Sequence, residues 1–108
     1  DKHNIEALKN EMIDILTNLS DLMLDNMILS IFFGEIIYSL LVNKTMKFSD
    51  FDSLCDLSDD TAISAIVDAF YYASKVSTND SKNFIKNGLE KDSKFFTKNK
   101  EKFSKLNE

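Results

Sequence analysis

Hydrophobic residues recur every three or four positions along most of the chain, which is the spacing of amphipathic helices. The pattern predicts a first helix from about Asn4 to Leu19, with one buried face. A second helix, from about Asn26 to Val42, is apolar nearly all round, which favours burial on several sides. The buried face of the first helix is predicted to hold Ile5, Leu8, Met12, Ile15 and Leu19.

Shorter helical segments follow, and side chains suited to N-caps stand before them. These candidate caps are Ser49, Ser58, Asp80 and Asp92. Gly88 is placed to end the helix that begins at Asp80. Small and apolar residues predict a closely packed stripe, and aromatic residues predict core packing near the C-terminus. The stripe holds Ala62, Ile66, Ala69, Phe70 and Ala73, and the C-terminal set is Phe95, Phe96, Phe103 and Leu106.

About six helices joined by short loops predict an all-α fold of stacked antiparallel hairpins, either a compact bundle or a fragment of a two-layer solenoid. Composition agrees, because the 108 residues include no Pro and only two Gly. We expect one helical domain across residues 1–108. The chain opens at Asp1 rather than Met, which leaves open that it is a piece of a longer protein.

Charge is divided unevenly along the sequence. Residues 1–80 carry 5 Lys and 14 acidic residues, whereas residues 81–108 carry 8 Lys and 4 acidic residues. An acidic body argues against direct nucleic-acid binding there. Every basic residue is Lys, which is typical of an AT-rich genome.

Two features bear on location. The apolar run of residues 27–42 is shorter than the roughly 20 residues that a bilayer-spanning helix requires, so we expect no membrane span. A single cysteine, Cys55, cannot form an internal disulfide and is expected on a buried apolar stripe, which favours a reducing, cytoplasmic setting.

The candidate binding residues are Asp21 and Asp25, which stand four positions apart just before the second helix. On a helix both carboxylates would share one face and could dock a basic partner. The alternative is that Asp25 caps the second helix and Asp21 is a solvated charge.

Nothing in the sequence forms a catalytic constellation, so we expect no enzyme activity and no cofactor. Five aspartates between residues 50 and 60 lack the central Gly and terminal Glu of a calcium loop, which favours helix starts over a metal site. His3 has no second ligand or nucleophile near it in sequence. Glu35, inside the apolar helix, is predicted to reach solvent at an edge.

The stretch LSDLMLDNM followed by ILSIFFGEIIYSLL resembles the HEAT-like helical-repeat domain that eukaryotic translation initiation factor 4 gamma scaffolds share with programmed cell death protein 4. That family has a Leu-x-Asp-Leu-x-Leu-Asp-x-Pro-like corner before an apolar helix. Met27 stands here where the family has proline.

The resemblance implies a non-enzymatic protein–protein interaction module that binds a DEAD-box RNA helicase of the initiation factor 4A type. By position, Asp21 and Asp25 would contact basic residues of the helicase. The alternative is a free-standing helical bundle from an AT-rich microbe or parasite, such as a surface antigen or a small phage or plasmid protein.

Overall fold

Every regular element is helical in the computed structural model, which describes residues 2–18 and 27–107. The elements are α1 (Lys2–Thr17), α3 (Met27–Val42), the 3-10 helix η1 (Phe48–Asp56), α4 (Asp60–Ala73), α5 (Thr78–Asp92), α6 (Lys94–Lys98) and the 3-10 helix η2 (Lys102–Asn107). The all-α prediction is therefore confirmed. The radius of gyration is 12.8 Å, close to the roughly 13 Å expected of a compact domain of this size.

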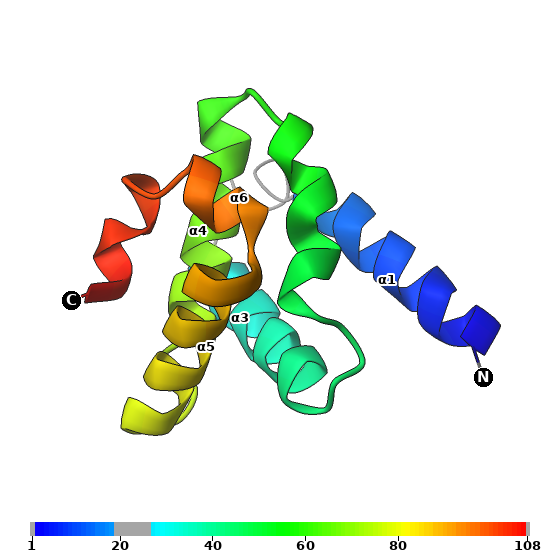
Figure 1. Ribbon diagram of the computed structural model, residues 1–108, viewed down its shortest axis with the longest axis horizontal. Helices are drawn as coiled ribbons and strands as arrows, with labels where there is room; N and C mark the ends of the chain where they lie inside the picture. The colour runs from blue at the N-terminus through cyan, green and yellow to red at the C-terminus, as the bar shows by residue number, and fades with distance from the viewer. Residues whose placement is uncertain (1, 19–26, 108) are drawn as a thin grey trace.

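Helix α4 lies at the centre of the bundle, with α3, α5, η2 and α1 all packed against it (Figure 1). It begins where the Asp59 carboxylate accepts a hydrogen bond from the Thr61 amide at 3.0 Å. The predicted stripe of small and apolar residues is confirmed, because all five of its members are buried. Alanines on this stripe let neighbouring backbones come close.

The closest approach is that of α3 to α4, at Gly34. A Cβ on Gly34 would lie 2.7 Å from the Cβ of Tyr72 and 2.8 Å from the backbone nitrogen of Ala73. Real Cβ atoms do not come so near to backbone, so glycine is required here by contact rather than by backbone conformation.

The prediction that the second helix is buried on several sides is wrong. Gly34, Ile37 and Leu41 lie on the side of α3 that faces the core, but Ile28, Ile31 and Phe32 on the opposite side are exposed. The physical reason is that α4 covers one side of α3, and none of the described elements covers the other to the same extent.

The N-terminal half of α1 extends away from the bundle (Figure 1). Met12 and Leu16 are buried, whereas Ile5 and Leu8 are 41% and 42% exposed. Of the predicted buried face of the first helix, Met12 is buried and Ile15 is half-buried, where η1 and α4 pack against α1, whereas the prediction is wrong for Ile5 and Leu8. Leu19 lies outside the described residues.

Helix starts fall near the predicted positions but use other caps. Asp59 rather than Ser58 caps α4, and the Ser93 hydroxyl rather than Asp92 caps α6 by accepting from the Phe96 amide at 3.1 Å. Both caps have the extended backbone that an N-cap requires.

Two more predicted boundaries are wrong. Ser49 lies inside η1, whose start is held instead by the Asp50 carboxylate, which accepts from the Lys47 amide at 2.7 Å. Helix α5 begins at Thr78, before Asp80, and continues through Gly88 to Asp92. Gly88 serves contact here, because the ring of Phe48 lies where its Cβ would stand.

The C-terminal aromatic residues pack as predicted: Phe95, Phe96, Phe103 and Leu106 are all buried. Phe103 contacts Phe70 of α4 at a ring-centroid distance of 6.0 Å and Phe95 of α6 at 5.8 Å. These contacts join η2 to both α4 and α6.

Alanine should destabilise the protein at both glycines, but to different extents. Gly34→Ala should lower the free energy of unfolding by about 2 kcal/mol, because overpacking against backbone outweighs the gain in helix propensity. Gly88→Ala should cost less than about 1 kcal/mol, since it meets the movable end of the half-buried Phe48 ring. Urea unfolding of both variants tests this, and equal losses would contradict it.

Candidate functional site

The sequence-predicted docking residues, Asp21 and Asp25, lie outside the described residues. Their proposed role as an acidic corner therefore stays a prediction.

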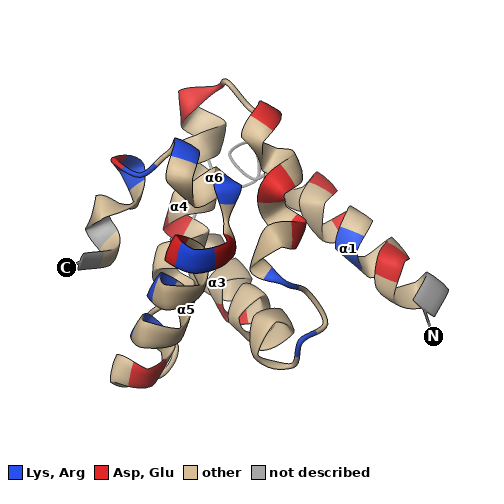
Figure 2. Ribbon diagram, viewed as in Figure 1, with Lys and Arg blue, Asp and Glu red and all other residues tan. Residues whose placement is uncertain are grey.

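The aspartates between residues 50 and 60 serve the fold at several helix starts. The Asp52 carboxylate accepts a hydrogen bond from the Lys94 amide at 2.9 Å, which joins η1 to the start of α6. Asp50 lies 3.4 Å from the Lys9 ammonium, and Asp60 lies 3.4 Å from that of Lys102. Figure 2 shows mostly acidic residues along α1, η1 and the start of α4, both charges on α5, and lysines on α6.

Cys55 packs against the core, as predicted for a residue on an apolar stripe, but it is only half-buried rather than buried. Burial raises the pKa of its thiol, and the nearby Asp52 carboxylate raises that pKa further. The thiol is therefore held in its protonated, less nucleophilic form near neutral pH.

Glu35 reaches solvent, as the sequence predicted for a charge inside an apolar helix. It is the single charged residue of α3. Its position therefore identifies the side of α3 that faces outward.

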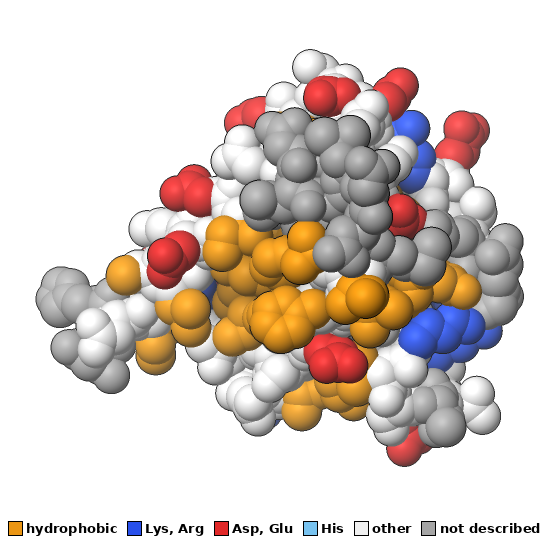
Figure 3. All heavy atoms as spheres, turned by 180° about the vertical axis from the view of Figure 1, so that it is seen from behind, with side chains coloured by type: hydrophobic (Ala, Val, Ile, Leu, Met, Phe, Trp, Pro, Cys, Tyr) orange, Lys and Arg blue, Asp and Glu red, His pale blue; other side chains and the backbone are white. Residues whose placement is uncertain are grey.

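A band of apolar side chains occupies the face of the molecule opposite to the view of Figure 1 (Figure 3). Helix α3 itself exposes Ile28, which is 72% exposed, Phe32, which is 54% exposed, and Ile31, which is 41% exposed. Val42, at the C-terminal end of the same helix, is 45% exposed. Large side chains so exposed and so close together mark interaction surfaces more often than a scattered exposed leucine does.

These residues form one line along the helix, which we call the α3 stripe. The stripe consists of Ile28, Ile31, Phe32, Glu35, Ser39 and Val42. At 3.6 residues per turn its members fall within an arc of about 100°. The opposite arc of α3 holds the buried residues and packs against α4. The stripe is therefore the whole outward face of this helix.

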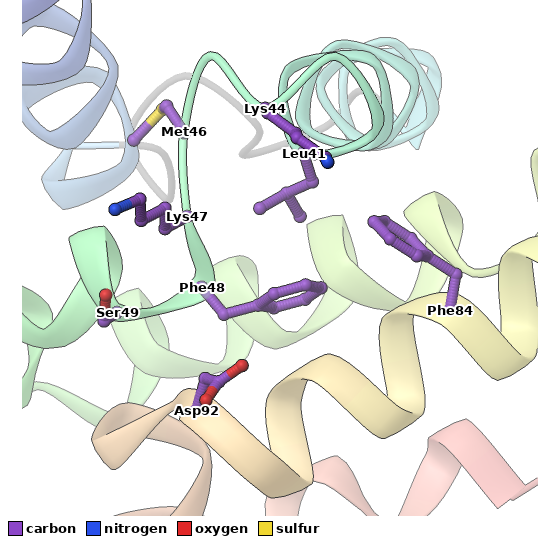
Figure 4. A pocket seen from close by; sticks show the side chains of 8 residues that line it. All are labelled: Leu41, Lys44, Met46, Lys47, Phe48, Ser49, Phe84 and Asp92. Carbon is purple, nitrogen blue, oxygen red and sulfur yellow. The ribbon is translucent and has the colours of Figure 1, made fainter.

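A separate hollow of about 420 Å³ lies between the segment after α3 and helix α5 (Figure 4). The ring centroids of Phe48 and Phe84 lie 5.6 Å apart there. Its lining is completed by Leu41, Lys44, Met46, Lys47, Ser49 and Asp92. Amines and a carboxylate are mixed around an apolar floor, so the hollow selects no one sign of ligand charge.

Comparison with known proteins gives no match among family models, curated proteins or solved structures. The resemblance to translation initiation scaffolds thus rests on the residues quoted for it. In the part of the chain that the structure describes, no helix combines the length and the apolar character needed to cross a bilayer.

Sequence reasoning missed the α3 stripe because α3 is apolar on nearly every side. The outward side could be recognised only from the few positions of α3 that are not large and apolar. Of these, Ser30 and Gly34 are buried, whereas Glu35 and Ser39 are exposed. A carboxylate is far more costly to bury than a serine, so Glu35 alone could have fixed the outward face.

The state of Cys55 predicts its reactivity. Iodoacetamide should alkylate Cys55 more slowly near neutral pH than it alkylates a small unhindered thiol, because the raised pKa leaves less thiolate. Asp56→Asn should speed the reaction by removing a charge that raises this pKa. When alkylation rates are measured against pH, the rate for the wild type should therefore rise at a higher pH than the rate for Asp56→Asn. Identical pH profiles would contradict the contribution of the Asp56 charge to the thiol pKa.

Proposed function

We propose that this protein is a protein–protein interaction domain whose contact surface is the α3 stripe. The observation that carries the proposal is the exposure of Ile28, Ile31 and Phe32 on a helix whose other face is fully used by the core. Burying a large apolar side chain stabilises a complex by about 1.5–3 kcal/mol. Three neighbouring side chains of this kind are enough to anchor an interface.

The packing of α3 on α4 favours binding at the α3 stripe. The contact of Gly34 with the α4 backbone fixes the position of the α3 backbone on the bundle, so the outward side chains start from one line on a folded helix. Preorganised groups lose less conformational entropy on association. The surface therefore suits recognition more than the mixed-charge hollow at Phe48 does.

The test is photo-crosslinking in the source cell, with a photoreactive amino acid in place of Ser39, an exposed stripe residue. We expect a discrete crosslinked protein that is lost in the double variant Ile28→Ser/Phe32→Ser. Ile5→Ser is the matched control, because Ile5 is 41% exposed and lies on the N-terminal half of α1, which extends away from the bundle. It should leave the crosslink unchanged.

Circular dichroism must show that the double variant keeps its helical signal, since its two changes lie on the exposed side of α3. A crosslinked protein that persists in the double variant, or no crosslink at all in the wild type, would overturn the proposed surface.

A finer form of the proposal is a translation-initiation scaffold that binds a DEAD-box RNA helicase through Asp21 and Asp25. Its support is the resemblance of LSDLMLDNM and the following helix to that family. Asp21→Ala/Asp25→Ala should then weaken helicase pull-down several-fold and leave the helical signal intact. Unchanged pull-down would remove the helicase, whereas the α3 stripe is tested separately by the crosslink.

A further inference from the structure

The spacing of the α3 stripe fits one particular kind of partner surface. Positions 28, 35 and 42 are seven residues apart, with positions 31, 32 and 39 between them. This is the 3.5-residue repeat along which two helices pack side chains between each other's side chains. A second α-helix laid along α3 would contact every member of the stripe.

Charge further defines that helix. Glu35 stands at the middle of the stripe and is exposed, and no ion pair to it occurs within residues 2–18 and 27–107. Covering the stripe would take the Glu35 carboxylate out of water, which is unfavourable unless the partner supplies a cation.

Resting on the proposed function, we propose that the α3 stripe binds an amphipathic helix of another protein with a lysine or arginine placed opposite Glu35. Apolar side chains of that helix would pack on Ile28, Phe32 and Val42. The charge pair would fix its register along α3, as single polar positions do in helix pairs.

A second copy of this chain fits the stripe poorly. In a parallel two-fold pair each residue faces its own counterpart, so Glu35 would meet Glu35. Glu35 also lies at the middle of Met27–Val42, so a fully overlapped antiparallel pair has the same result. Like charges at the centre of an apolar contact oppose both arrangements.

A membrane surface fits poorly too. Helices that lie on bilayers carry lysine or arginine beside their apolar face. Helix α3 contains no basic residue, and its one charge is negative. Anionic lipid would therefore be repelled at the centre of the stripe.

The experiment uses two synthetic helical peptides of identical apolar heptads, one with lysine and one with glutamate at the central position. Fluorescence anisotropy at low salt should show the whole chain binding the lysine peptide at least about tenfold more tightly, because the covered carboxylate gains a cation in one complex and meets a like charge in the other. Glu35→Lys should reverse this preference, and Glu35→Gln should abolish it.

Ile28→Ser/Phe32→Ser should lose both peptides, and Ile5→Ser should keep both with the lysine preference intact. Binding of both peptides through the stripe without any preference that follows residue 35 would overturn the inference while leaving the proposed function in place. Failure of both peptides to bind would also overturn the inference that the partner is an amphipathic helix.

Two further outcomes decide against it. Self-association of the wild-type chain in sedimentation, lost in the Ile28→Ser/Phe32→Ser variant, would assign the stripe to a second copy. Stripe-dependent binding to phosphatidylserine vesicles, with no peptide preference, would assign it to a lipid surface.

Discussion

The backbone contact between α3 and α4 at Gly34 is the constraint on which the rest of the structure depends. Because a Cβ there would lie within 3 Å of Tyr72 and of the Ala73 nitrogen, the two helices can be this close only with glycine. The contact sets how deeply α3 sits on α4. It thereby determines which side of α3 belongs to the core and which faces water.

The remainder of the core is built outward from α4, largely by aromatic rings. The ring of Phe70 in α4 packs edge to face on Phe51 of η1 and on Phe103 of η2. The ring-centroid distances are 5.2 Å and 6.0 Å. Such pairs add to the burial of their area through the charge distribution of the rings. The two 3-10 helices, which are distant in sequence, are thus both held by α4, and α4 rather than α3 is the centre of the fold.

The helical periodicity of the sequence was sufficient to predict the fold class and the buried alanine stripe of α4. It could not predict that Ile5 and Leu8 stay exposed, because helix periodicity shows which residues share a face but not whether another element covers that face. Caps were displaced by one residue at Asp59 and Ser93, since neighbouring polar side chains compete for the same role. The α3 stripe was hidden for a related reason: an all-apolar helix gives no contrast between its sides, and only Glu35 supplied one.

The division of α3 into a glycine-backed inner side and a side-chain-rich outer side has a consequence for how this protein can change over generations. Substitutions on the inner side are tied to the integrity of the whole bundle, whereas those on the outer side touch little beneath them. Folding and the proposed recognition would therefore be separable traits in this helix. Under that proposal, the outward side chains could change or be re-engineered while the scaffold under them stays constant.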